Sequence, residues 1–176
     1  KIKISADIKR HEWDFSNLQT DGNFKNYVDT DGTTKKVGID VSEHQGVIDW
    51  AAVAPQIDFA FIRLGYRGYT TGGMALDAYY TANMTGAAEQ GIPVGVYFFS
   101  QATTYEEGVE EANFVLSNLG EYALSYPIVL DREDPMSDDE RTNDLSAEQH
   151  TQAALGFLQT IQAAGYATMM YTNRMY

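Results

Sequence analysis

Short apolar runs alternate with helical patterns from Val37 onward, and this alternation constrains the fold more than any other feature of the chain. Strands that alternate with helices build βαβ units, so the sequence predicts an α/β fold with a parallel sheet and right-handed crossovers. All five runs are apolar enough to be buried on both faces of that sheet. The predicted strands are Val37–Val41, Asp58–Leu64, Ile92–Ser100, Pro127–Asp131 and Tyr166–Thr172.

Helical patterns fill the intervals between these strands. The predicted helices are Met74–Gln90, Tyr105–Leu119 and Ala147–Ala164, each followed by a glycine, and a shorter one around Ile48–Ala54. A glycine just past the last periodic residue is a helix stop signal. Two pairs have the spacing of a capping box, namely Thr103 with Glu106 and Ser146 with Gln149. The acidic run Glu106, Glu107, Glu110 and Glu111 suits the start of a helix and is interpreted as a solvated face.

Composition narrows the possible partners. The 176 residues include 12 Lys and Arg against 25 Asp and Glu, a formal net charge of -13 that argues against nucleic acid or an anionic membrane as a partner. The absence of Cys removes disulfides, thiolate metal sites and a Cys nucleophile. No stretch is apolar enough to span a bilayer and the start shows no signal-peptide pattern, although a mature chain would have lost one.

Residues 1–36 differ in character from the rest and are predicted to be an N-terminal arm or linker, or a small β-hairpin. Turn signals occur at Asp21-Gly22 and Asp31-Gly32. The stretch 29–32 resembles the start of a calcium loop, but the distal Glu of such a loop is missing, so a turn is predicted there.

Two carboxylates lie two residues apart at the end of a predicted strand, in Asp131-Arg132-Glu133. Residues i and i+2 of a strand share a face, so the two side chains would project together, roughly 6–7 Å apart along the chain. Repulsion between them should raise one pKa and leave a protonated acid beside an ionised partner. The pair is therefore a candidate acid/base pair, and the alternative is a solvated acidic strand end before the polar loop 134–144.

Further polar residues fall at the carboxyl ends of the predicted strands, where parallel sheets carry their functional sites. They are Asp40, Arg63, Ser100 and Thr172, together with Asp131 and Glu133. Asp40 ends the first predicted strand within the block 38–50, GIDVSEHQGVIDW, which is rich in hydrogen-bonding side chains.

The block 38–50 resembles the opening motif of the glycoside hydrolase family 25 muramidases, lysozymes that cut peptidoglycan. The runs 59–65, 93–99 and 127–133 are similar to the second, third and catalytic strands of that family, and the resemblance extends in order from Val37 to about Asn173. It implies a TIM-barrel-like (β/α) barrel and a catalytic domain over residues 37–176 with about five strands present. It also implies that the C-terminal part of the domain is absent, so that a second polypeptide or an oligomer would complete the barrel.

The resemblance also implies roles for the carboxylates, without a cofactor. Glu133 would be the general acid, and Asp131 would orient the 2-acetamido group of the substrate or stabilise the developing cation. Asp40 would add negative potential. Such a site supplies the proton and the negative charge that an oxocarbenium-like transition state needs. Arg132 departs from the family pattern, because an apolar residue is usual there; Asp138, Asp139 and Glu140 are its predicted partners.

Predicted substrate-binding residues surround these carboxylates: Gln45, His44, Arg63, Tyr97 and Tyr171. Tyr66 and Tyr69 could also stack on sugar rings, but Tyr97 and Tyr171 are preferred because their strands end at the site. His44 is interpreted as a hydrogen-bonding loop residue and not as a metal ligand, since a metal-binding spacing is missing. His11 and His150 are assigned to the surface or to packing.

Three functions compete at this point. The first is an N-acetylmuramidase that hydrolyses the β-1,4 bond between N-acetylmuramic acid and N-acetylglucosamine in the glycan strands of peptidoglycan, in the extracellular space or cell wall. The second is a non-catalytic glycan-binding module on the same scaffold. The third is a metal-dependent hydrolase with Asp40, His44, Asp131 and Glu133 as ligands.

Overall fold

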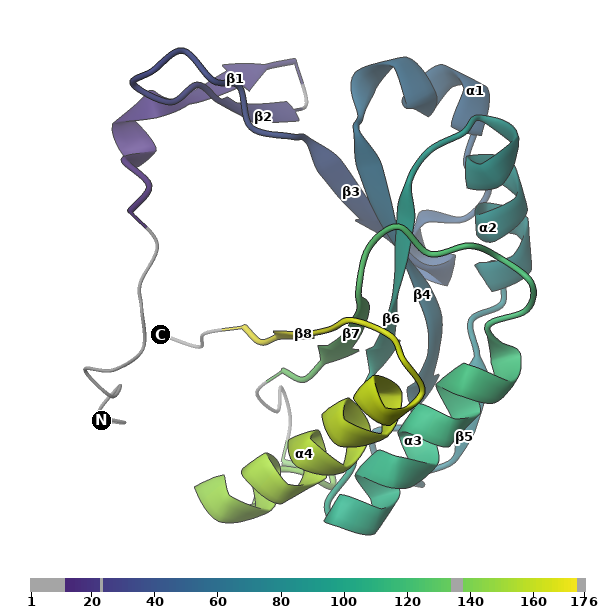
Figure 1. Cartoon of the computed structure of the whole chain (residues 1–176). Helices are drawn as coiled ribbons and strands as arrows, with labels where there is room; N and C mark the ends of the chain where they lie inside the picture. Colours follow the sequence, from purple (N-terminus) through teal and green to yellow (C-terminus); the bar gives the residue numbers. More distant parts are fainter. Residues whose placement is uncertain (1–11, 23, 134–137, 174–176) are drawn as a thin grey trace. The chain divides into compact units, whose positions relative to one another are not determined.

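The computed structural model describes residues 12–22, 24–133 and 138–173, so residues 134–137 of the expected polar loop lie outside it. The chain divides into two compact units, Lys1–Val37 and Gly38–Tyr176 (Figure 1). The first unit holds an antiparallel hairpin of β1 (Leu18–Asp21) and β2 (Phe24–Tyr27). The Tyr27 ring is buried in this unit, with its centroid 5.0 Å from that of Trp13. Residues 29–32 form a turn, in which the Gly32 amide donates to the Asp29 carbonyl at 2.9 Å.

The second unit is built on a parallel sheet with the strand order β3-β4-β6-β7-β8. The strands are β3 (Gly38–Val41), β4 (Phe59–Arg67), β6 (Val94–Phe99), β7 (Ile128–Asp131) and β8 (Thr168–Tyr171). All five predicted strands are therefore present, and the predicted α/β class is confirmed. Figure 1 shows the helices of this unit packed along one side of the sheet.

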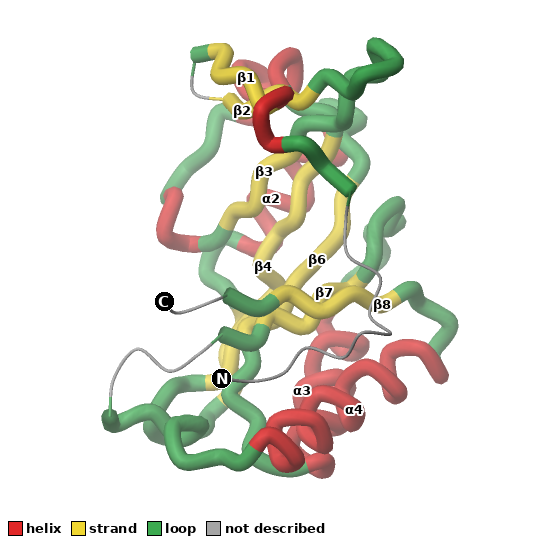
Figure 2. Tube along the Cα trace, turned by 90° about the vertical axis from the view of Figure 1, so that its left-hand side faces the viewer, coloured by secondary structure: helices red, strands yellow, loops and turns green. Residues whose placement is uncertain are grey.

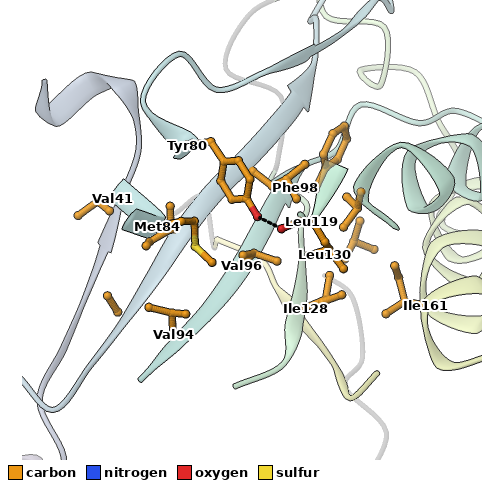
Figure 3. Close-up of a cluster of buried hydrophobic side chains, with 14 of the residues drawn as sticks. Val41, Tyr80, Met84, Val94, Val96, Phe98, Leu119, Ile128, Leu130 and Ile161 are labelled. Atoms are coloured by element: carbon orange, nitrogen blue, oxygen red, sulfur yellow. Dashed lines mark hydrogen bonds between the residues drawn. The ribbon is translucent and has the colours of Figure 1, made fainter. Parts of the chain in front are cut away.

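The two faces of the sheet have different surroundings. On the helix side, side chains such as Val96, Phe98, Ile128 and Leu130 form the hydrophobic core (Figure 3). Burial on both faces was predicted for all five strands, and this is wrong for β3 and β8. Asp40 of β3 is exposed, and the β8 ring of Tyr171 is 51% exposed. The sequence signal was misleading because the second face carries Tyr, Phe and Met side chains, which are apolar yet line an open cavity.

Four helices cover the core: α1 (Trp50–Val53), α2 (Tyr80–Glu89), α3 (Tyr105–Asn118) and α4 (Ala147–Ala163). The glycines predicted to end the longer helices, Gly91, Gly120 and Gly165, all have positive φ. The capping box of Ser146 and Gln149 is present, whereas α3 is capped one residue later than predicted, by Thr104. No helix among the described residues is long and apolar enough to cross a bilayer.

The prediction of one helix over Met74–Gln90 is wrong in its first part. Met74–Leu76 forms a short strand, β5, which pairs antiparallel with the end of β4. Asp77 then separates the strand from the helix: its carboxylate accepts from the Tyr79 amide at 2.9 Å and its carbonyl accepts from the Tyr80 amide at 3.1 Å. The helix α2 therefore begins only at Tyr80.

Helices α3 and α4 lie side by side, as both views show (Figures 1 and 2). Two glycines make this close approach possible. A Cβ atom at Gly108 would collide with the Ala153 carbonyl, and one at Gly156 would collide with the Tyr105 carbonyl. The pair fixes α3 and α4 against each other behind β6 and β7.

Candidate active site

A cavity of about 450 Å³ lies over the second face of the sheet, at the carboxyl ends of its strands. It is lined by all eight residues that the sequence predicted for the site: Asp40, His44, Gln45, Arg63, Tyr97, Asp131, Glu133 and Tyr171. The other lining residues are Ser42, Phe61, Tyr69, Phe99, Val129 and Met169. Ser100 and Thr172, also predicted at strand ends, are not among the lining residues.

The strand register explains why these residues meet. Arg63, Tyr97, Val129 and Met169 are direct partners across β4, β6, β7 and β8, and Phe99, Asp131 and Tyr171 are partners one step further along. Because successive side chains alternate between faces, these odd-numbered residues all face the cavity. On β4, β6 and β7 their even-numbered neighbours, such as Ile62, Phe98 and Leu130, fill the core, whereas Met170 of β8 is exposed.

Asp131 is the most strongly perturbed acid of the cavity. Asp131 is only 8% exposed, and burial raises the pKa of its carboxyl group to about 7. The charges of Glu133 and Asp40 and a hydrogen bond with Glu133 act in the same direction, while the charge of Arg63 opposes them. The sequence predicted one raised pKa in this pair, and the structure places it on Asp131. Atom Oδ1 of Asp131 is buried and has no hydrogen-bond donor among the described residues.

Glu133 is held by a residue that sequence reasoning did not assign to the site. The side-chain amide of Asn173 donates to Oε2 of Glu133 at 2.6 Å. Asn173 follows the end of β8, so the rule that parallel strands carry functional residues at their carboxyl ends could have identified it.

The first loop is fixed by its own capping box. The Ser42 amide and hydroxyl donate to Oε1 of Gln45 at 2.8 and 3.2 Å, and the turn closes at Gly46, whose φ is 66°. An L side chain rarely adopts this φ, so glycine is required there. The loop therefore presents His44 and Gln45 to the cavity in one conformation.

Arg63 ties this loop to the sheet. Its Nε donates to Asp77 at 2.7 Å, its Nη2 to Glu43 at 2.9 Å, and its Nη1 lies 3.4 Å from Nε2 of His44. Asp77 also accepts from the Glu43 amide at 2.9 Å. Most of the guanidinium is thus engaged within the protein. Asp77 was missed because nothing in its predicted helical context marks it as a buried acceptor.

Aromatic side chains complete the walls. Burial raises the pKa of Tyr97 to about 12, and burial together with the charge of Glu133 raises the pKa of Tyr171. Both phenols therefore stay neutral and can donate to a ligand. Tyr69, which the sequence ranked below these two, also lines the cavity and lies 5.4 Å from Phe99 between ring centroids. Tyr66 instead stacks on the Arg63 guanidinium at 5.0 Å.

Arg132 points away from the cavity, as predicted, but its partners are not those predicted. It donates to Ser100 Oγ at 3.3 Å and to His150 Nδ1 at 3.1 Å. The carboxylates that act on its charge belong to Glu111 and Glu107 of α3, not to the acidic loop. His150 therefore has a specific partner, contrary to its assignment to surface or packing.

The prediction that the acidic run of α3 is a solvated face holds for Glu106 and Glu110, which are exposed, but is wrong for Glu111 and Glu107. Glu111 is 0% exposed and accepts from Nε of Arg67 at 2.8 Å. Glu107 forms an ion pair of 2.6 Å with Arg141. The partners of these acids, the buried Arg67 and the half-buried Arg141, are distant from them in sequence. Among the described residues, no group of three or more His, Asp or Glu side chains is placed to hold a metal ion.

Comparison with known proteins gives consistent results. Lysozyme M1 of Streptomyces globisporus is 35% identical over 100 residues, which cover 54% of this chain and 32% of that protein. The bacterial lysozyme from Streptomyces coelicolor matches with a TM-score of 0.62 and 30% identity, over 77% of this chain and 61% of the other. The modular autolysin LytC from Streptococcus pneumoniae, solved in complex with a synthetic peptidoglycan ligand, matches with a TM-score of 0.70 and 23% identity, over 90% of this chain and 38% of that one.

The family model of the glycosyl hydrolases family 25 matches residues 39–176. This match spans the whole cavity-bearing sheet and most of the 176-residue chain. The chain spans about a third of the length of Lysozyme M1, and somewhat more of LytC. The sequence, the fold and the cavity together lead to one assignment, and the chain belongs to glycosyl hydrolase family 25.

Proposed function

We propose that this chain carries an N-acetylmuramidase site that hydrolyses the β-1,4 bond between N-acetylmuramic acid and N-acetylglucosamine in peptidoglycan. The observation that carries the proposal is the pair Asp131 and Glu133, joined by a hydrogen bond and facing a cavity lined by tyrosines. Family membership supports glycosidase chemistry, and LytC offers a relative that binds a peptidoglycan ligand. Peptidoglycan is an extracellular polymer, so the site would act outside the cell or within its wall.

The pair can hold and move one proton. The pKa of about 7 leaves Asp131 largely protonated below neutral pH, and the hydrogen bond connects this proton to Glu133. Transfer along that bond would make Glu133 the acid that protonates the glycosidic oxygen. Asp131 would then be ionised when positive charge develops at the anomeric carbon, where it could orient the 2-acetamido group or stabilise the cation. The negative potential of Asp40 would support the same step.

The remaining cavity residues suit a sugar polymer. A tyrosine face covers the apolar C–H side of a pyranose, and its phenol can reach a hydroxyl group. Tyr97, Tyr171 and Tyr69 occupy different walls of the cavity and would bind successive parts of a glycan. The loop of His44 and Gln45, fixed by Arg63, would supply further polar contacts.

The proposal is tested by Glu133→Gln in the chain as it exists. The amide keeps the shape of the side chain and cannot donate the proton, so muropeptide release from purified cell walls should fall about 10²–10⁴-fold. Glu89→Gln, an exposed position at the end of α2, is the matched control and should hydrolyse like the unaltered protein. Binding of glycan without muropeptide release by the unaltered protein would favour the non-catalytic glycan-binding module instead.

A further inference from the structure

Arg132 is a buried cation directly behind the carboxylate pair. It stands between Asp131 and Glu133 in the chain, and its residue is only 4% exposed. Because alternate residues of an extended chain face opposite ways, its side chain enters the layer between the sheet and the helices. Burial lowers the pKa of the Arg132 guanidinium, so this placement has an energetic cost that its contacts must offset.

The guanidinium joins the end of β7 to two other elements. Nη1 donates to Ser100 Oγ at 3.3 Å, just past the end of β6. Nε and Nη2 both lie close to Nδ1 of His150 in α4, at 3.1 and 3.0 Å. Since Nδ1 accepts these bonds, the imidazole must be neutral, with its proton on Nε2.

The backbone at the same point is held from both sides. The Arg132 amide donates to the Tyr171 carbonyl at 3.0 Å, and the Ser100 amide donates to the Asp131 carbonyl at 2.8 Å. These bonds hold the position of the strand end, and the side chains on its two faces add to what holds its rotation about its own axis. Arg132 is the side chain that points away from the cavity, so its anchorage determines how far its two neighbours project into it.

A buried carboxylate balances the charge of Arg132. Glu111 of α3 is 0% exposed, and Ser100, the residue that also receives the Arg132 bond, acts on its carboxyl group and lowers its pKa against the larger effect of burial. The charges of Glu111 and Glu107 act on Arg132 and favour its charged form. Ser100 therefore connects Arg132 to Glu111, which Arg67 and the Gln101 amide hold in place at 2.8 and 3.3 Å.

We propose that Arg132 is a positioning residue: its hydrogen bonds to Ser100 and to His150 of α4 set the depth and orientation of Asp131 and Glu133 in the cavity. Arg132 does not line the cavity and acts through its two neighbours. Its effect on rate rests on the proposed muramidase function, but its effect on the burial of Asp131 does not. The two effects can therefore be measured separately.

Three variants separate geometry from charge. Arg132→Lys keeps the positive charge but cannot reach Ser100 and His150 together. His150→Leu removes the acceptor and leaves Arg132 in place. His150→Asn is the matched control, because its side-chain oxygen can take the place of Nδ1 as an acceptor.

The readout is the titration of the Asp131 carboxyl carbon by NMR in the full chain, together with muropeptide release. We expect Arg132→Lys and His150→Leu to lower the pKa of Asp131 by about one unit or more, because the carboxyl group gains access to water. The turnover rate should fall about tenfold or more, with little change in KM, because the acid is displaced from the bond that it protonates. His150→Asn should behave like the unaltered protein in both measurements.

Several outcomes would overturn the proposal. An unchanged Asp131 titration in folded Arg132→Lys and His150→Leu would show that the hydrogen bonds of Arg132 do not set the position of the two carboxylates. Equal behaviour of His150→Asn and His150→Leu would show that the acceptor has no role. If Arg132→Lys fails to fold, the two His150 variants decide the question. If the unaltered protein releases no muropeptides, the function is wrong, and the NMR titration still tests the positioning.

Discussion

The burial of the Asp131 carboxyl group should make the stability of the protein depend on pH. Its pKa is about 7 in the folded chain, against a value of 3.8 for a carboxyl group of this type in water. Between these two values the folded state holds a proton that the unfolded state has released. The free energy of unfolding contributed by this group is therefore fully present below pH 4 and is lost as the pH rises through 7.

Asp131→Asn removes this titration while it keeps the size of the side chain. We expect the unaltered protein to lose up to about 4 kcal/mol of stability relative to the variant between pH 4 and pH 8. Urea unfolding across that range measures the free energy of unfolding of both proteins. The contribution of the other carboxylates cancels in the difference between the two proteins. A difference that stays constant with pH would contradict the raised pKa.

The contact between the two carboxyl groups also predicts the stereochemistry of the reaction. Retaining glycosidases hold their carboxyl groups about 5–5.5 Å apart, whereas inverting enzymes keep them about 6.5–9.5 Å apart to leave room for a water. Asp131 and Glu133 share a hydrogen bond, so no such water fits between them. Proton NMR of the first product should show the β-anomer, and an initial α-anomer would reject this arrangement.

The sequence was sufficient to identify the carboxylate pair and the strand ends, because a period of two and the βα order determine both. It could not assign the proton within the pair, since that depends on how deeply each carboxyl group is buried. Asp77 and His150 were missed for a related reason: their partners, Arg63 and Arg132, lie 14 and 18 residues away in sequence. Such pairings become visible only when the register of the sheet is known.

At the scale of single elements, the close packing of α3 on α4 is the feature most open to test. Gly156→Ala would add a methyl group against the Tyr105 carbonyl, where no space exists. Overpacking costs about 1–3 kcal/mol, and the gain in helix propensity of about 1 kcal/mol offsets only part of it. We expect a net loss of about 1–2 kcal/mol and a lower thermal unfolding midpoint, since helix backbones yield little.

Gln152→Ala, at an exposed position of the same helix, provides the control and should change stability by no more than about 0.5 kcal/mol. A Gly156→Ala protein that is more stable than the unaltered chain would show that helix propensity dominates there.

Tertiary pairing overrode local sequence preference at Met74–Leu76. The sequence predicted a helix there, and pairing with β4 produced a strand. The secondary structure of a short segment next to a long strand depends on the pairing that the strand offers more than on the pattern of the segment itself.

The whole molecule consists of two compact units that meet at Val37 and Gly38. Trypsin should distinguish them, because Arg63, Arg67 and Arg132 are buried in the second unit, whereas the first unit presents Lys25, Lys35 and Lys36 at or near its surface. Among the described residues, we expect the early cuts at these three lysines, detected by intact mass after brief digestion. Early cleavage at any of the three buried arginines would contradict the division into units.

The alternation of cavity-facing and core-facing residues along β7 restricts how this site can change in evolution. A single inserted residue before Leu130 would move Asp131 and Glu133 to the helix side and turn Leu130 toward the cavity. Both the hydrocarbon layer and the acid pair would survive only if a β-bulge absorbed the extra residue, as the irregularity between Arg63 and Gly65 does in β4. Substitutions and changes in loop length at the rim leave this alternation intact, whereas an insertion within β7 does so only through a bulge.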